Sequence, residues 1–183
     1  MLIATGWVLR RHYKDDALAR MVMIGRKSPN TKNAAQRLED AIFRSWVNPP
    51  KLKEFSVQTP KRVFGLLKLD EAGDGVLQSP IFTFWTTYLD YFNKANPGKK
   101  ESIISALTAS YSDEALVQIL ESAKKVPSTE KLATKLQAEQ LDLFLKDRKA
   151  PSDVAALLKV QDKTDANWQL WKNYQTKFEP PSD

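Results

Sequence analysis

Apolar residues recur three and four positions apart along most of the chain, a period typical of amphipathic helices. The clearest stretch, 79–96, begins with Ser79-Pro80, a helix start signal, and ends before Pro97-Gly98, a helix stop signal. One side of this predicted helix would carry four aromatic side chains and a leucine: Phe82, Trp85, Tyr88, Leu89 and Phe92. We expect the rest of the chain to fold around this aromatic helix.

The same periodicity predicts an all-α protein with further helices over 2–12, 14–27, about 30–46, 61–69, 99–110, 113–123, 130–146, 151–158 and 168–178. Gly6 should weaken the first of them. Residues 48–59 are predicted to form a loop and 70–75 a turn. The helix over 14–27 has an apolar stripe expected to face the interior: Ala17, Leu18, Met21, Val22 and Ile24.

Three sequence segments occur twice, in the same order. Tyr13–Leu18 resembles Tyr111–Leu116, and Val63–Lys68 resembles Val154–Lys159. In the third segment, Trp85, Tyr88 and Phe92 correspond to Trp171, Tyr174 and Phe178. The spacing between the copies changes only in the predicted loop and turn, where changes in length are tolerated. The order and spacing predict tandem helical-bundle repeats.

The repeat predicts a division of the chain into four parts. Residues 1–46 would be the end of a preceding unit, 47–146 a complete unit, and 147–178 the start of a following unit. Residues 179–183 are predicted to be a disordered tail.

The aromatic residues of the repeats are the predicted structural core: Tyr13, Trp46, Trp85, Tyr88, Tyr111, Trp171 and Tyr174. Trp85, Tyr88, Trp168 and Trp171 could instead form a stacking platform for single-stranded nucleic acid. Their helical spacing beside leucines favours core packing. We therefore expect function to depend on the polar surface, where the sequence assigns no partner-binding residue.

The composition narrows the chemistry that the chain could perform. It contains no cysteine and one histidine, which excludes disulfides and thiolate sites. His12 lies among basic residues with no second histidine for a metal site, so we predict an exposed, non-catalytic side chain. The acidic pairs Asp15-Asp16 and Asp113-Glu114 are predicted to cap helix starts and favour the helix dipole. We expect no enzymatic activity, catalytic residue, metal or cofactor.

The chain has a formal net charge of +6, from 28 Lys and Arg against 22 Asp and Glu. An alternative function is therefore that of a basic helical protein that binds nucleic acid electrostatically. The two signs alternate and no basic tract occurs, which favours a solvated helical surface over a nucleic-acid site. No apolar run approaches the length of a membrane span, so we expect no membrane association.

The order of a leucine-rich helix over 63–69, a tryptophan helix over 79–93 and the motif Tyr111–Leu116 resembles the L-W-Y units of oomycete RXLR effectors of the Phytophthora type, the WY-domain proteins. The resemblance implies helical bundles joined into an elongated rod, with Trp85 and Tyr111 as a core pair. Tyr13 and Trp171 would belong to incomplete units. No Arg-x-Leu-Arg motif occurs, so we expect a fragment or a processed mature region.

The resemblance also implies a function. Proteins of this family are secreted by a plant pathogen, enter the host cell and suppress immunity by binding a host protein in the cytoplasm or nucleus, mostly without catalysis. Some tandem L-W-Y members recruit a host serine/threonine phosphatase core through its scaffold subunit. We accordingly expect a monomeric protein whose partner is a host plant protein, with the phosphatase scaffold subunit as the candidate.

Overall fold

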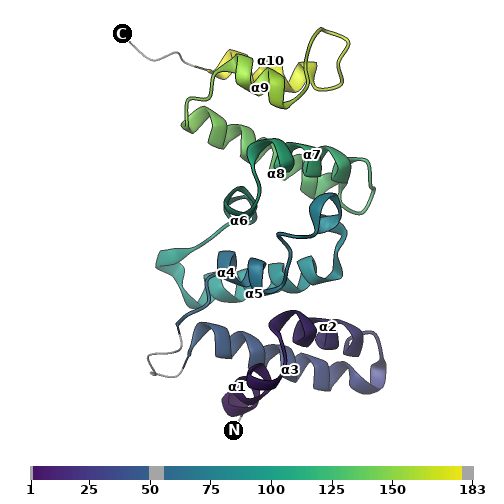
Figure 1. Cartoon of the computed structure of the whole chain (residues 1–183), viewed down its shortest axis with the longest axis vertical. Helices are drawn as coiled ribbons and strands as arrows, with labels where there is room; N and C mark the ends of the chain where they lie inside the picture. Colours follow the sequence, from purple (N-terminus) through teal and green to yellow (C-terminus); the bar gives the residue numbers. More distant parts are fainter. Residues whose placement is uncertain (1, 50–55, 179–183) are drawn as a thin grey trace. The chain divides into compact units, whose positions relative to one another are not determined.

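The computed structural model describes residues 2–49 and 56–178, and every regular element in these ranges is helical (Figure 1). The predicted all-α class is confirmed. In chain order the α-helices and the 3₁₀ helices (η) are α1 Leu2–His12, α2 Asp15–Gly25, α3 Pro29–Val47, α4 Pro60–Leu66, η1 Gly73–Gln78, α5 Pro80–Ala95, η2 Pro97–Lys99, α6 Ile103–Ser110, α7 Asp113–Lys124, α8 Glu130–Lys146, α9 Pro151–Leu157 and α10 Trp168–Lys177.

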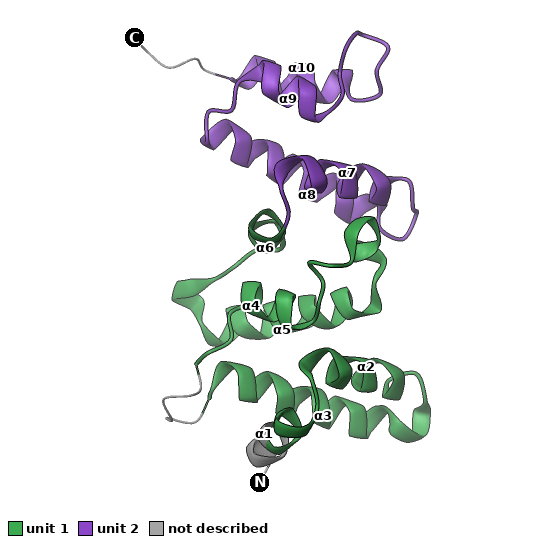
Figure 2. Ribbon diagram, viewed as in Figure 1, with its two compact units in different colours: residues 1–110 green, residues 111–183 purple. Residues whose placement is uncertain are grey.

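The chain packs into two compact units (Figure 2). The first unit comprises residues 1–110 and contains α1 to α6, and the second comprises residues 111–183 and contains α7 to α10. These units are defined by packing and not by sequence similarity. The predicted repeat boundaries and the elongated rod therefore stay predictions. The predicted disordered tail, 179–183, lies outside the described residues.

Hydroxyl side chains cap several helices. The Oγ1 atom of Thr59 accepts from the backbone N–H of Arg62 at the start of α4, and Ser112 Oγ accepts from the N–H of Ala115 at the start of α7. The carboxylates expected to cap α2 and α7 lie in the first turns of these helices. Asp15 forms no cap hydrogen bond and instead pairs with Arg10 at 2.7 Å. A side-chain cap at this position of α2 was therefore a wrong expectation.

Three helices end with a residue in the left-handed region, where glycine is usual. Lys68, Arg148 and Lys159 have φ values of 56°, 54° and 55°. After Lys68 and Lys159, the next backbone N–H reaches back five residues, from Leu69 to the Phe64 carbonyl and from Val160 to the Ala155 carbonyl. These left-handed residues turn the chain at the ends of α4 and α9 into the loops that lead to α5 and α10.

In the first unit, α5 packs against α2, α3 and α4, while α1 and α2 pack against α3. The Trp46 and Tyr88 rings meet edge to face at 4.9 Å between centroids, and Phe64 meets Trp85 at 5.1 Å. Both geometries are favourable for aromatic pairs. The aromatic residues of α3 and α5 thus form the centre of this unit's core.

In the second unit, α7 packs against α8, and α10 packs against α8 and α9. Its apolar cluster of buried residues comprises Val117, Leu141, Phe144, Val154, Leu158 and Tyr174. Trp171 and Phe178 are only partly buried at the edge of this cluster. The aromatic helix of this unit is therefore less completely covered than α5.

The structure differs from the predicted helices mainly at their ends, and the helix predicted over 61–69 ends at Leu66. The third helix begins at Pro29 after Ser28, the helix expected from residue 99 begins at Ile103, and the predicted turn at 70–75 runs into η1. Apolar periodicity indicates which residues share a face, and it says little about the turn at which a helix starts.

Candidate partner-binding surfaces

The predicted core aromatics differ in how far they are buried. Trp46, Trp85, Tyr88 and Tyr174 are buried, whereas Tyr111 and Trp171 are half-buried. Trp85 and Tyr88 consequently offer no exposed face on which a base could stack.

The polar atoms of Trp85 and Tyr88 bind backbone carbonyls near the start of α4. The indole N–H of Trp85 donates to the Pro60 carbonyl at 2.8 Å, and the Tyr88 hydroxyl donates to the Gln58 carbonyl at 2.5 Å. Burial raises the pKa of the Tyr88 phenol well above its usual range, so the hydroxyl stays protonated as a donor. The two bonds fix the segment before α4 to the aromatic helix.

The second unit makes the same pair of bonds. Trp171 donates to the Pro151 carbonyl at 2.8 Å, and Tyr174 donates to the Lys149 carbonyl at 2.5 Å. The predicted repeat equates Pro151 with Pro60 and Lys149 with Gln58, so donors and acceptors both correspond. This agreement supports the predicted repeat, because backbone acceptors were not used to align the sequence.

Tyr13 is not a core residue, which corrects the prediction. It lies in the corner between α1 and α2, and its side chain is 46% exposed. It lines an open cavity of about 490 Å³, which we call the corner cavity, together with Arg10, Arg11, His12, Lys14, Asp15, Asp16, Gly65, Leu66, Lys68 and Glu71. A tyrosine at the rim of a cavity is typical of protein-binding surfaces, where tyrosine and arginine are enriched.

The corner cavity carries charges of both signs. Arg10 and Asp15, both largely buried, form an ion pair there. His12 is exposed on its rim. No group of three acidic or histidine side chains in the described part of the chain could hold a metal ion. The corner cavity therefore resembles a mixed polar contact surface more than a site for one strongly charged ligand.

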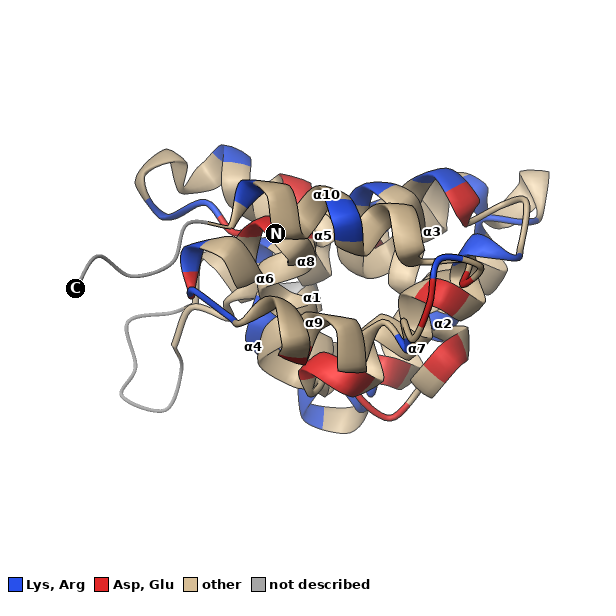
Figure 3. Ribbon diagram, turned by 90° about the horizontal axis from the view of Figure 1, so that it is seen from above, with Lys and Arg blue, Asp and Glu red and all other residues tan. Residues whose placement is uncertain are grey.

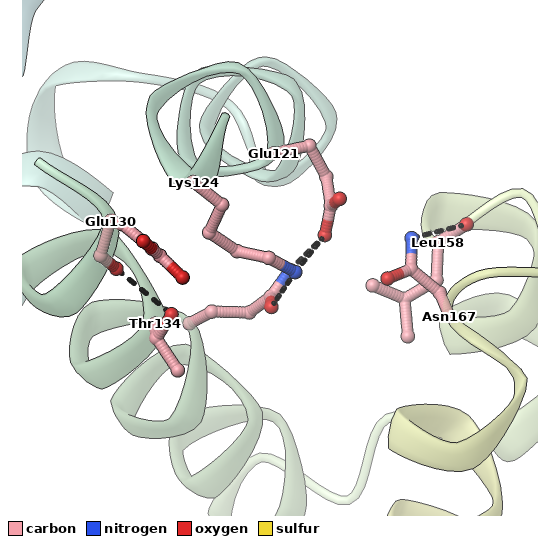
Figure 4. A network of polar contacts seen from close by, with 7 residues as sticks. Glu121, Lys124, Glu130, Thr134, Leu158 and Asn167 are labelled. Carbon is pink, nitrogen blue, oxygen red and sulfur yellow. Dashed lines mark hydrogen bonds and ion pairs between the residues drawn. The ribbon is translucent and has the colours of Figure 1, made fainter. Parts of the chain in front are cut away.

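Two smaller cavities lie at positions that the predicted repeat equates. The α2–α5 groove of the first unit has a volume of about 210 Å³ and is lined by Arg20, Met23, Ile24, Lys27, Ser79, Pro80 and Ile81. The α7 groove of the second unit has a volume of about 280 Å³ and is lined by Val117, Gln118, Glu121, Leu157, Leu158, Lys159, Asp165, Ala166 and Asn167. In Figure 4, Glu121 of α7 lies on one side and Leu158 and Asn167 on the other.

A polar network borders the α7 groove. Lys124 Nζ donates to Glu121 Oε1 at 2.9 Å and to Gln137 Oε1 at 2.8 Å (Figure 4). In the first unit, the residues that the repeat equates with Lys124 and Gln137 are Arg26 and Glu39, which form an ion pair. Burial raises the pKa of the Glu39 carboxyl, and the nearby Arg26 partly opposes this effect.

Basic and acidic residues both occur along α2, α3, α5, α7 and α8, whereas α1, α4 and α10 carry basic residues without acidic ones (Figure 3). Within the described ranges, no helix combines the length and the apolar character needed to cross a bilayer.

No protein-family model matches the chain. It is 39% identical over 177 residues to the RxLR effector protein PSR2 of Phytophthora sojae, in an alignment that covers 93% of this chain. The chain is homologous to the RxLR effectors of Phytophthora. The resemblance seen in the sequence is thereby confirmed. A PSR2 protein of Phytophthora infestans is 34% identical over 176 residues, again with 93% of this chain covered.

A solved structure of the same kind agrees with these RxLR relatives. The crystal structure of PcRxLR12 superposes with a TM-score of 0.75 at 34% sequence identity, covering 97% of this chain and 43% of that one. The chain spans 25% and 22% of the lengths of the two PSR2 relatives. The homology therefore covers almost all of this chain and only a part of each relative.

Proposed function

We propose that this chain is part of a virulence effector that a plant pathogen secretes and that acts inside the host plant cell. It suppresses plant immunity there by binding a host protein, without catalysing a reaction. The observation that carries this proposal is the homology to RxLR effectors over 93% of the chain. Secretion and entry into host cells are what the name of this group implies for the whole protein.

The use of the aromatic residues supports a binding role on the polar surface. Trp85, Tyr88 and Tyr174 are buried and hydrogen-bonded to backbone carbonyls. These side chains thus serve the fold and leave recognition to the exposed residues around the corner cavity and the two grooves. The sequence also has no cysteine and a single histidine, which leaves few groups for nucleophilic or acid–base chemistry.

The partner that we propose is the scaffold subunit of a host serine/threonine phosphatase, bound by a single copy of this chain. The support is the resemblance to tandem L-W-Y effectors, some of which recruit a phosphatase core in this way. The chain would then act as a replacement for a regulatory subunit.

A titration calorimetry experiment tests this partner. The whole chain is titrated into the purified plant scaffold subunit and, as a control, into the catalytic subunit alone. We expect saturable binding of one chain to the scaffold subunit and none to the catalytic subunit. No heat with the scaffold subunit would remove the phosphatase from the proposal. The broader role in host binding would be rejected if no plant protein were retained reproducibly by the chain.

A further inference from the structure

One face of α2 is apolar and exposed. Leu18, Ala19 and Val22 are buried against the rest of the first unit, but Met21 is 47% and Ile24 69% exposed. The sequence pattern predicted that Met21 and Ile24 would also face the interior, and this prediction was wrong. Two neighbouring large apolar side chains on a helix surface are more informative than a single one, because apolar patches mark contact sites.

The exposed Ile24 continues into the α2–α5 groove. Ile81 at the base of this groove is buried, Met23 is half-buried, and Pro80 begins α5 beside them. The volume of about 210 Å³ is smaller than that of most small-molecule sites, which span roughly 300–1,000 Å³. A groove of this size and lining fits one apolar side chain of a protein partner.

Two cations border this apolar space. Arg20 and Lys27 line the groove, and its lining includes no acidic residue. Neither of them takes part in an ion pair described for the chain. An apolar floor with a positively charged rim is complementary to an apolar anchor flanked by carboxylates. Nucleic acid would satisfy the charges but would leave the apolar floor without a matching group.

The corresponding groove of the second unit has a different lining. The repeat equates Arg20 with Gln118 and Met23 with Glu121, and it equates Ser79 with Asp165. The cavity is thus present at the same place in both units, while the charged residues of its lining change from two cations alone to Glu121, Asp165 and Lys159. A change of lining at a constant position is what selection of different partners requires.

We propose that the α2–α5 groove docks an acidic segment of the host partner, with one apolar side chain in the groove and carboxylates on Arg20 and Lys27. This inference rests on the proposed host-binding function and adds to it the surface and the chemistry of the partner. The α7 groove of the second unit should accept the same segment less well, because its lining sets two carboxylates, Glu121 and Asp165, against one cation, Lys159.

Fluorescence anisotropy of a labelled peptide tests the groove directly. The probe is a short peptide rich in glutamate and aspartate with one central leucine, titrated with the whole chain. Control peptides replace the leucine by serine or all acidic residues by glutamine. We expect saturable binding of the probe, weakened about tenfold by either replacement, because each removes one of the two complementary features.

Two charge-reversal variants distinguish the groove from net charge. The double variant Arg20→Glu with Lys27→Glu should weaken probe binding at least about tenfold. The matched control, Lys32→Glu with Arg37→Glu, makes the same change of charge at exposed positions of α3 and should bind as the unaltered chain does. Ile24→Asp should also weaken binding, and far-UV circular dichroism melts verify that every variant is folded.

Several results would overturn the inference. These are the absence of saturable binding, an equal loss in the two double variants, or full displacement of the probe by polyuridylic acid. The scaffold-subunit titration separates this inference from the proposed function. Scaffold binding that is equal in the unaltered chain and in the Arg20→Glu, Lys27→Glu variant would refute the groove alone, while probe binding without scaffold binding would refute the phosphatase alone.

Discussion

At the scale of single residues, Trp85 and Trp171 hold equivalent places with different burial. Trp85 is fully buried and Trp171 half-buried, although both donate to a proline carbonyl at 2.8 Å. We expect Trp85→Ala to lower the free energy of unfolding by about 3–5 kcal/mol, because it leaves a large cavity. Trp171→Ala should cost less, since fewer contacts are lost. Urea titrations followed by far-UV circular dichroism measure both, and equal costs would contradict the difference in packing.

The helical spacing placed Trp46, Trp85 and Tyr88 in the core, where the structure has them. The spacing could not predict the exposure of Tyr13, because a side chain at a corner between two helices is buried only if another element covers that corner. The sequence pattern also could not predict that the Pro60 and Gln58 carbonyls accept hydrogen bonds from Trp85 and Tyr88. These bonds depend on how the segment before α4 approaches α5.

Glu39 is a buried carboxylate where the second unit has Gln137. Its raised pKa means that the folded state holds the proton more tightly than the unfolded state, whose value is near 4.5. The tighter proton binding stabilises the folded state. This stabilisation is complete below pH 4.5 and is lost as the pH rises through the folded-state pKa. Glu39→Gln removes this dependence. We expect a free energy of unfolding within about 1 kcal/mol of the unaltered chain at neutral pH, because the amide avoids the cost of a buried charge.

Urea titrations at several pH values from 4.5 upward compare the unaltered chain with Glu39→Gln. The stability of the unaltered chain should fall relative to that of the variant as the pH rises. Arg26→Ala is the control, because it leaves the buried carboxylate without its partner and should lower the free energy of unfolding at neutral pH more than Glu39→Gln does. Parallel pH profiles for the unaltered chain and Glu39→Gln would refute the assignment.

At the scale of helices, α1 depends on a close approach to α3. A β-carbon on Gly6 would lie 2.4 Å from the Ala41 carbonyl oxygen, and this backbone atom cannot move away easily. Gly6→Ala should therefore lower the free energy of unfolding by about 1–3 kcal/mol, although alanine favours helices. Gly75→Ala is the control, because nothing lies within 4 Å of its added carbon. Thermal melts followed by circular dichroism should show a lower midpoint for Gly6→Ala only.

The sequence predicted which segments are helical because their apolar period is long and regular. It predicted that Gly6 would weaken α1, because glycine has a low helix propensity. Propensity describes an isolated helix, so it could not reveal the close contact between Gly6 and Ala41. It also assigned five apolar residues of α2 to one interior face. Helix packing buries only the side chains that meet a neighbour, so Met21 and Ile24 remain exposed.

At the scale of the whole molecule, the net charge of +6 and the homology to RxLR effectors favour different functions. The homologues are RxLR effectors, whereas a basic protein attracts nucleic acid. The mixture of both signs along α2, α3, α5, α7 and α8 limits the number of phosphates that these helices could neutralise together (Figure 3). The surface therefore favours the proposed host-protein binding over the nucleic-acid alternative.

We predict that the chain causes no gel shift of single-stranded RNA or double-stranded DNA at about 50 mM salt. If the chain bound phosphates, the binding constant would rise with each basic side chain in contact. The logarithm of this constant would fall linearly with the logarithm of the salt concentration. A polylysine peptide serves as the positive control for the gel. A saturable shift of either nucleic acid with that linear salt dependence would contradict the prediction and restore the nucleic-acid alternative, because it would show that the 28 basic side chains act together despite the 22 acidic ones.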